Sequence, residues 1–443
     1  MSAEHQLTIQ SADPTAEITV YDASFNRVAR GVGGYRGSHP DALYEIRVRT
    51  AGTQEGQLIS LAGDKTVNVG PVAFASPVPL TDTTTTDPAH EAAVLRACEA
   101  PISVGSGSGL LIVVRDPSGG EPSTRPGSPA TGLSLIGADG TAVYDVGKKA
   151  AIDASGRSPV AAILVHVNAG VYRLRMELPN QPSRERSLVA SPGWTTQCFM
   201  IRRSFREQAA ADLAHGSLSL SQLGRPFAAD DKRTRLSEAA SYALANNRKV
   251  TQAAARALME EKFQDPMLGL LVGHLLLRDT PEASILGEVV GNLIKLLGSE
   301  HPDVQALMLA ASSPDAPSSV TQMPMLRASW DAIVARTLTQ PSLVPAQSPA
   351  ALVSARVLPS APWLTWEAAD APTARQADAK MAVLRGFLNR PAEPSLEGAA
   401  QYRDFSFSAP SPPTLDTEDR AELARSLGVP SSVLDDMLSK LDK

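Results

Sequence analysis

The hydrophobic period of this chain changes near Arg203, and that change most constrains how the chain can fold. Before it, apolar and polar residues alternate in runs such as Ala16–Tyr21 and Tyr44–Arg49, which is the pattern of half-buried β-strands. After it, apolar residues recur at three- and four-residue spacing in segments rich in alanine and leucine, which is typical of α-helices. The sequence therefore predicts β modules followed by helices.

Length and composition limit the class of protein. A chain of 443 residues, at roughly 100–200 residues per domain, is long enough for two to four domains. Its 43% hydrophobic content and net charge of −6 exclude a disordered chain, and no apolar run approaches the roughly 18 residues of a membrane span. The first residues lack the basic and apolar stretches of a signal peptide. Cys98 and Cys198 are too few for a disulfide framework, so we expect a cytoplasmic protein.

The N-terminal half divides into two β modules. We expect an antiparallel β-sandwich over residues 1–80, a connector with a short helix over 81–101, and a second antiparallel β-sandwich over 102–203. The first module has a strand, a polar turn, a strand and a later strand around Tyr44, and the second module repeats this order around Tyr172. This internal repeat favours two related modules over one large irregular sheet.

Both modules carry a short motif that resembles a known type of domain. Asn168-Ala169-Gly170-Val171-Tyr172-Arg173-Leu174 is similar to the later strand of transthyretin-like, carboxypeptidase-regulatory β-sandwiches. Asp41-Ala42-Leu43-Tyr44-Glu45-Ile46 is a weaker match because it lacks the glycine. The resemblance implies a structural or docking role without chemistry of its own.

Residues 204–366 read as an all-α domain, either a bundle or a short solenoid, with a proline-rich strap. Seven helices are expected, over Phe205–Ala214, Leu236–Asn246, Val250–Phe263, Pro266–Leu277, Pro281–Leu297, Pro302–Ala310 and Leu326–Leu338. Pro266–Leu277 is apolar nearly all round, so it should be the buried centre. Prolines interrupt residues 312–362, and the tryptophans in and beside this stretch should hold it against the helices.

The C-terminal part is expected to comprise a short helix over 367–388, a flexible linker over 389–414 and a helical hairpin over 415–443. The hairpin resembles a helix-turn-helix unit through the spacing of Ala424, Gly428, Val429, Leu434 and Met437. From Thr414 onward, however, seven acidic residues face four basic ones, 4 − 7 = −3, and a duplex should repel such a surface. We therefore expect protein partners and no nucleic acid or membrane. The candidate partner-binding residues are Leu427, Val429, Val433, Leu434, Met437 and Leu438.

No catalytic, cofactor-binding or metal-binding motif is found. Gly105–Gly109 runs into an apolar strand and reads as a turn, since a dinucleotide loop must open a helix. His90-Glu91 lacks a second histidine at zinc spacing, and His274 lies among leucines as a core residue would. Cys198 reads as a buried, inert thiol. We expect a protein that is not an enzyme and needs no cofactor, although a site assembled from dispersed residues stays open.

Basic residues gather only around the β-to-α junction. One group is Arg202, Arg203 and Arg206, and the other is Arg225, Lys232, Arg233 and Arg235. They read as a solvated face, or as a docking site for an acidic partner such as the hairpin of this same chain.

The order of the whole chain resembles uncharacterised bacterial multidomain proteins associated with caspase-like and CHAT-type proteases in antiviral defence. The resemblance rests on Asp265-Pro266-Met267-Leu268-Gly269 and Met325-Leu326-Arg327-Ala328-Ser329-Trp330. It implies an adaptor for such a protease, or a substrate cut within 389–414, since proteases favour exposed polar segments. The alternative is a transcription-linked regulator whose hairpin binds a transcription factor or DNA.

Overall fold

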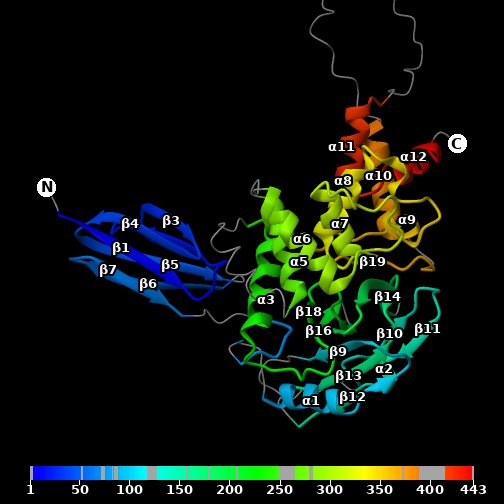
Figure 1. Cartoon of the computed structure of the whole chain (residues 1–443), viewed down its shortest axis with the longest axis horizontal. Coiled ribbons are helices and arrows are strands. Elements are labelled where there is room, and N and C mark those ends of the chain that lie inside the picture. The colour runs from blue at the N-terminus through cyan, green and yellow to red at the C-terminus, as the bar shows by residue number, and fades with distance from the viewer. Residues whose placement is uncertain are drawn as a thin grey trace, which may run out of the picture.

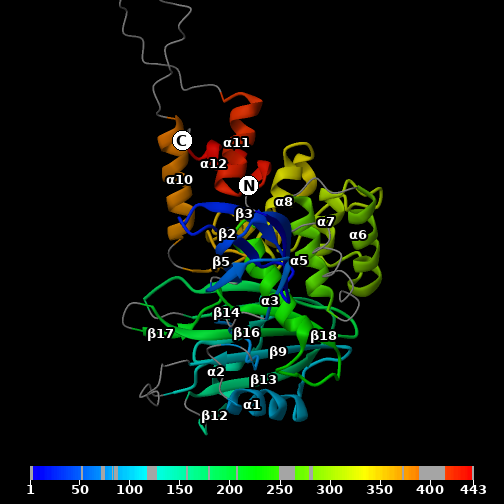
Figure 2. The same cartoon turned by 90° about the vertical axis from the view of Figure 1, so that its left-hand side faces the viewer.

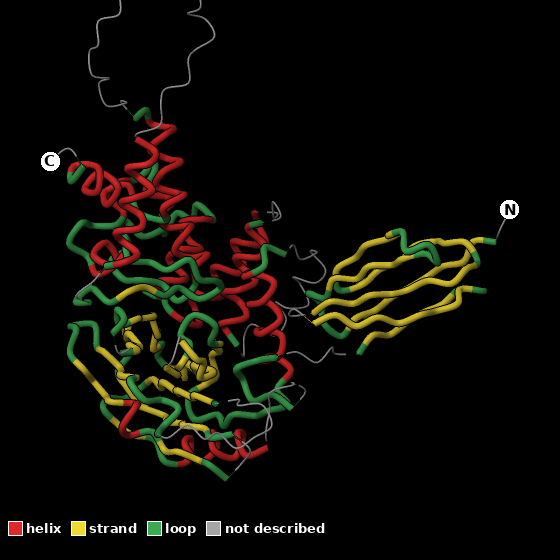
Figure 3. Tube along the Cα trace, turned by 180° about the vertical axis from the view of Figure 1, so that it is seen from behind, coloured by secondary structure: helices red, strands yellow, loops and turns green. Residues whose placement is uncertain are grey.

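A computed structural model gives the structure of the chain (Figure 1). The residues that it describes are 3–50, 53–70, 75–81, 83, 88–116, 127–155, 158–177, 180–205, 208–248, 265–278, 283–371, 374–388 and 415–441. Several β-sheets occupy the N-terminal half, and helices occupy most of the C-terminal half, as the change of period predicts (Figure 3). Among the described helices, none combines the length and the apolar character needed to cross a membrane.

The N-terminal module consists of two small sheets. Their strands are β1 (Glu4–Ser11), β2 (Glu17–Tyr21), β3 (Arg27–Val32), β4 (Gly34–Pro40), β5 (Ala42–Thr50), β6 (Thr53–Leu61) and β7 (Lys65–Val69). One sheet has the order β3-β2-β5-β6 and the other β4-β1-β7. Alternate residues such as Ile9, Val20 and Ile46 share one apolar core and are almost fully buried, which accounts for the alternating sequence.

The second β region has a seven-stranded and a five-stranded sheet. The first comprises β8 (Ile102–Ser103), β9 (Ser108–Arg115), β12 (Ala151–Asp153), β13 (Val160–Val167), β16 (Trp194–Phe205), β17 (Gln208–Ala211) and β18 (Ser217–Gln222). The second is ordered β11-β10-β14-β15-β19, with bounds Ala142–Asp145, Leu133–Ile136, Gly170–Met176, Arg184–Ala190 and Trp366–Glu367. A short helix, α2 (Val146–Lys149), follows β11.

Strand β9 shows why the middle of this region reads as a continuous apolar run. All eight of its residues are buried. Leu110 and Ile112 contribute to the large central core, whereas Leu111 and Val113 pack with Val94 of helix α1 (Pro88–Glu99). A strand that is covered on both faces needs apolar residues at every position.

Two sequence-based expectations are wrong in this half. Phe205–Ala214 is not a helix: Phe205 ends β16, and β17 and β18 pair with β16, so the sheet extends beyond residue 203. The short alanine-rich stretch has no strong period of its own, and the open edge of β16 offers backbone partners. The modules are also not purely antiparallel, because β1–β7, β8–β13 and β9–β16 pair in parallel. A period of two does not encode strand direction.

The helices follow, and α5 (Pro266–Leu277) lies at their centre. The others are α3 (Lys232–Ala245), α6 (Ala283–Leu297), α7 (Pro302–Ala310), α8 (Arg327–Thr337), the 3-10 helix η1 (Pro341–Leu343), α9 (Pro349–Ser354), α10 (Arg375–Leu388), α11 (Thr417–Leu427) and α12 (Ser431–Ser439). Residues Pro266–Leu276 are all buried, and the Asp265 carboxylate caps the first turn by accepting from Met267 N at 3.1 Å. The predicted helix Val250–Phe263 and the predicted linker 389–414 lie outside the described residues.

The proline-rich segment packs along the helices. Trp330, Trp363 and Trp366 are each at most 1% exposed. Trp363 bridges Leu326 at the start of α8, and Trp366 belongs to β19, which adds to the edge of β15. Part of this segment lies against the five-stranded sheet, since Ser187 Oγ donates to Met323 O and β19 pairs with β15. The helices α10, α11 and α12 lie at the opposite end of the main body from α1 (Figure 2).

Candidate functional site

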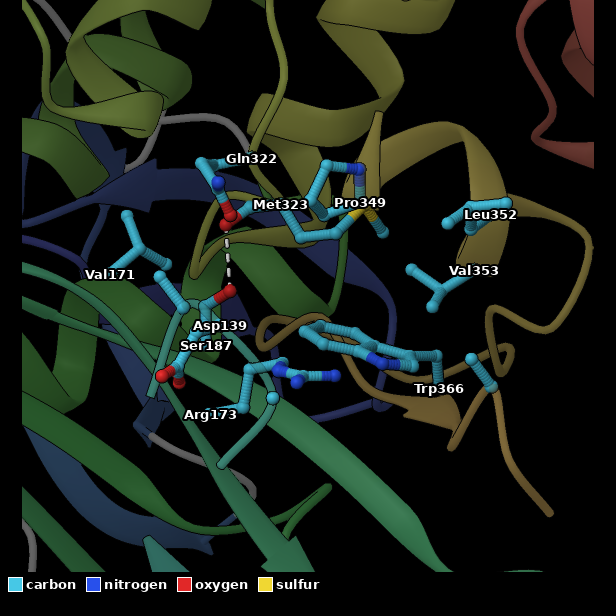
Figure 4. Close-up of a pocket in the computed structure, with 13 residues that line it drawn as sticks. Asp139, Val171, Arg173, Ser187, Gln322, Met323, Pro349, Leu352, Val353 and Trp366 are labelled. Carbon is cyan, nitrogen blue, oxygen red and sulfur yellow. Dashed lines mark hydrogen bonds between the residues drawn. The ribbon is translucent and has the colours of Figure 1, made fainter. Parts of the chain in front are cut away.

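A crevice opens where the proline-rich segment meets the turn between β10 and β11 (Figure 4). Its volume is about 170 Å³, close to the size of one large side chain. Val171, Met323, Val353 and Trp366 supply apolar walls, and Arg173 lies beside the Trp366 ring. The crevice therefore joins residues from a β-turn, two strands and the strap that are far apart in sequence.

The charged groups beside the crevice are already paired. Glu185, fully buried, accepts from Arg173 Nη1 at 3.1 Å, from Arg175 Nε at 2.8 Å and from Trp366 Nε1 at 3.0 Å. Arg175 also donates to Asp370 at 2.8 Å. Burial alone would lower the pKa of Arg175, but its bonds to Glu185 and Asp370 raise that pKa, so the guanidinium stays charged. This network fastens the strap to the sheet.

The crevice can hold an apolar group but shows no catalytic pair. Ser187, the hydroxyl residue that lines it, donates from Oγ to Met323 O at 2.6 Å. A serine nucleophile needs a base in hydrogen-bond reach to take its proton, and this hydroxyl is bonded to a carbonyl instead.

Among the described residues, His90 and Ser158 form a histidine–serine pair like that of a catalytic dyad. The histidine, however, donates the hydrogen bond that a base would accept. His90 Nε2 lies 2.9 Å from Ser158 Oγ, and Arg115 Nη1 lies 3.1 Å from His90 Nδ1. Burial lowers the pKa of Arg115 to about 10, so the guanidinium is still protonated at neutral pH and can only donate. Nδ1 is therefore the acceptor, and Nε2 carries the proton and donates to the serine. His90 in this tautomer cannot act as a base toward Ser158.

Other candidates from the sequence are structural. His274 is 3% exposed and its Nε2 bonds to Ser329 Oγ at 2.8 Å; burial lowers the pKa of His274 to about 3. Cys198 is fully buried, and burial raises the pKa of its thiol. Within the described ranges, no group of three or more histidine, cysteine or acidic residues could hold a metal ion.

The C-terminal hairpin, formed by α11 and α12, is seated on the rest of the chain. Trp330 Nε1 donates to Gly428 O at 3.0 Å, and Ser431 N donates to Thr337 Oγ1 at 3.2 Å. Gly428 ends α11 in the left-handed region at φ 61°, which a residue with a Cβ adopts poorly. Pro430, at the N-cap of α12, makes no side-chain cap, so Thr337 of α8 caps that helix across the interface.

Apolar contacts complete this docking site, which we call the seat. The seat comprises Trp330 and Thr337 of α8, Leu338 directly after it, Val344, and Leu384 of α10. The six candidate partner-binding residues all meet at it: Leu427, Val429, Leu434 and Met437 are at most 6% exposed, and Val433 and Leu438 are partly buried. The sequence pattern groups these six residues on one surface but does not predict the seat, because no local pattern links Trp330 to Gly428.

The exposed side of the hairpin is acidic, and it does not dock on the basic junction. Arg420 pairs with Asp435 at 2.7 Å and Lys440 with Asp436 at 2.6 Å, all of them exposed. Arg233, offered by the sequence as a docking residue, bonds to Asp231 at the start of α3 instead. The prediction that the hairpin docks there is wrong, since its contacts are with α8, η1 and α10.

Helix α10 carries a buried lysine next to the seat. Lys380 is 8% exposed and donates from Nζ to Ser354 O at 3.1 Å. Burial lowers the pKa of Lys380 to about 7, and the charge of Arg327 lowers it further against the opposing effect of Asp331. The lysine is thus held in a place that favours its neutral form.

The contribution of Lys380 to the free energy of unfolding should therefore become more favourable as the pH rises. Unfolded lysine titrates near 10.4, so between pH 7 and pH 10 the unfolded chain binds more protons than the folded one. Lys380→Met removes this dependence, so it should raise stability at pH 6 and have little effect at pH 10, the difference changing by about 1.4 kcal/mol per pH unit at most. Urea unfolding across this range measures it. A difference from wild type that does not vary with pH, or one matched by the exposed variant Lys440→Met, would contradict the expectation.

Comparisons with known proteins add little to this geometry. No protein-family model matches the chain, and no curated protein matches it in sequence. A solved structure of the Bacillus anthracis TIE protein aligns with 47% of this chain, at 10% identity and a TM-score of 0.17. The aligned part spans 31% of that protein, about a third of its length.

Proposed function

We propose that this chain is an interaction protein without chemistry of its own, and that it holds its C-terminal hairpin on its own body until a partner or a protease acts. The observation that carries the proposal is the seat: the apolar face through which the hairpin would bind a partner is occupied by α8 and α10. Trp330 Nε1 donates to Gly428 O and Thr337 Oγ1 accepts from Ser431 N, and these hydrogen bonds fix the turn between its helices in one position. Partner binding and docking then compete for the same residues.

The covalent link sets the outcome of this competition. Residues 389–414 join α10 to α11, and a tether of such length gives the hairpin an effective concentration near the millimolar range at the seat. A partner of equal affinity at micromolar concentration would lose by about a thousandfold. Cutting the tether removes this advantage, because the hairpin can then return to the seat only from solution, at the concentration of the fragment itself. Proteolysis within 389–414 would thus act as the switch.

We further propose that the protease is of the caspase-like or CHAT type, and that the chain is its regulatory partner or cleavable substrate in a bacterial defence system. The support is the resemblance of the sequence and the position of residues 389–414 between two docked elements. The two β modules, as transthyretin-like sandwiches, would serve as docking scaffolds in the same assembly.

A transcription-linked regulator is the second candidate. The hairpin has the αL glycine of a helix-turn-helix unit, and its two helices pack against each other, which favours this hypothesis. The exposed carboxylates Asp435 and Asp436 on α12 disfavour a duplex and fit a basic surface of a transcription factor. Salt-sensitive binding of the released hairpin to duplex would support DNA, whereas salt-tolerant binding to a protein would favour docking on a protein partner.

The test is to place a recognition site for a specific protease within residues 389–414, express the tagged chain in its native host, and compare co-purifying proteins before and after cutting. We expect a partner that joins the hairpin fragment only after cutting. A matched variant with the same number of residues and a scrambled recognition site should stay uncut and capture nothing more. Identical partner sets from cut and uncut protein would contradict the proposal.

A further inference from the structure

A second cavity lies apart from the hairpin, between residues of the four-stranded sheet and the residues that follow α3. Its volume is about 710 Å³. The sheet contributes Glu17, Arg30 and Arg49, and the residues that follow α3 contribute Asn246, Asn247 and Arg248. A cavity of this volume is within the range of about 300–1,000 Å³ that small ligands occupy in proteins.

The charges that face this cationic cleft are mostly positive. Three guanidinium groups, those of Arg30, Arg49 and Arg248, face one carboxylate, that of Glu17, which pairs with Arg30. Among the described residues, no carboxylate lies within ion-pair distance of Arg49 or Arg248. Two positive charges of the cleft are therefore left without a counter-charge among the described residues.

Local structure holds these groups at the mouth of the cleft. Arg248 donates from Nη1 to Arg49 O at 3.4 Å and lies over the Tyr242 ring at 5.1 Å, so its guanidinium is held near the sheet. Asn246 donates to Tyr242 O at 2.8 Å, which leaves its amide oxygen as an acceptor. Asn247 adopts φ 54°, a left-handed conformation that turns the chain back toward the cleft.

We propose that the cleft binds a phosphate-rich anion of nucleotide size, such as a nucleoside triphosphate. Guanidinium groups recognise phosphate oxygens through paired hydrogen bonds, and Arg49 and Arg248 supply the two unbalanced charges that a polyphosphate needs. Arg30 adds a third donor once Glu17 is displaced from it. The amides of Asn246 and Asn247 offer both donors and acceptors to the organic part of the ligand.

Calorimetric titration of the full chain with ATP and with pyrophosphate tests this proposal. ATP should bind saturably and more weakly as salt is raised, and Arg49→Gln and Arg248→Gln should each weaken binding at least tenfold. The control is Arg36→Gln: Arg36 is exposed on β4, bonds to Gln6 at 2.7 Å and lies outside the cleft, so binding should not change.

Three results would overturn the proposal. They are no saturable binding of either anion up to millimolar concentration, equal weakening by Arg36→Gln, and preference for a single-stranded oligonucleotide over ATP. Pyrophosphate that binds as tightly as ATP would still support the cleft as a phosphate site and would assign the affinity to the arginines. Because Arg36 and Arg49 are exposed and Arg248 is only half-buried, circular dichroism should show that all variants fold.

Discussion

Replacing Arg115 by methionine is expected to lower the free energy of unfolding by about 3–5 kcal/mol, the range for breaking a buried charge pair. Arg115 is fully buried at the end of β9 and donates to Pro77 O at 2.8 Å, to Ser76 O and to His90. Its charge also stabilises the buried carboxylate of Glu238, whose pKa burial raises. Methionine fills the space but leaves these acceptors and that carboxylate without the guanidinium.

A second buried arginine provides the matched control. Arg186 of β15 is also fully buried, but it donates only from Nη1, to Leu213 O at 3.0 Å; its Nε and Nη2 make no hydrogen bond to the described residues. Arg186→Met should therefore change stability far less than Arg115→Met, or raise it. Urea unfolding followed by tryptophan fluorescence measures both, since all four tryptophans lie in the main body. Equal losses from the two variants would contradict the assignment of Arg115 as the partnered one.

Trp330→Ala is expected to cost about 3–5 kcal/mol and to release the hairpin. Trp330 is fully buried, and its ring packs in the core of the strap while its Nε1 holds Gly428 O. Trp330→Phe keeps most of the ring but loses the hydrogen bond, so it should cost roughly 1 kcal/mol and act mainly on the hairpin. Hydrogen exchange of the backbone amides of α12 separates these effects, because local opening exposes them without global unfolding.

A second threonine just after α8 provides a control for the cap that Thr337 supplies to α12. Thr337→Val removes the hydroxyl that accepts from Ser431 N, and α12 should exchange faster. Thr339→Val removes an exposed hydroxyl that bonds only to Arg336 O, and exchange in α12 should not change. If the backbone amides of α12 exchange at the same rate in both variants, Thr337 does not cap that helix.

Where signals are local, the sequence predicts the elements closely. Helix α5 begins at Pro266 after the Asp265 cap and ends at Leu277, as the proline and the apolar run indicate. Helix α7 likewise begins at Pro302, with His301 capping it through Asp303 N. Strand alternation in β2 and β5 also matches burial, because each has one face on a core.

Features that depend on residues far apart in the sequence could not be predicted from local patterns. The direction of β9 against β16 depends on a connection of many residues, and local periodicity does not record it. The two arginines of the cationic cleft, Arg49 and Arg248, come from segments 199 residues apart. The seat joins Trp330 to Gly428 across 98 residues, so the apolar face of the hairpin could be recognised, but not what covers it.

Gel filtration of the purified chain after cutting within residues 389–414 tests the central claim most directly. If the hairpin is held by the seat, the fragment that begins near α11 should elute with the body at tens of micromolar protein and separate from it on dilution or in Trp330→Ala. If the fragment elutes alone from the wild-type body at every concentration, the hairpin is not docked, and the proposed competition between seat and partner does not exist.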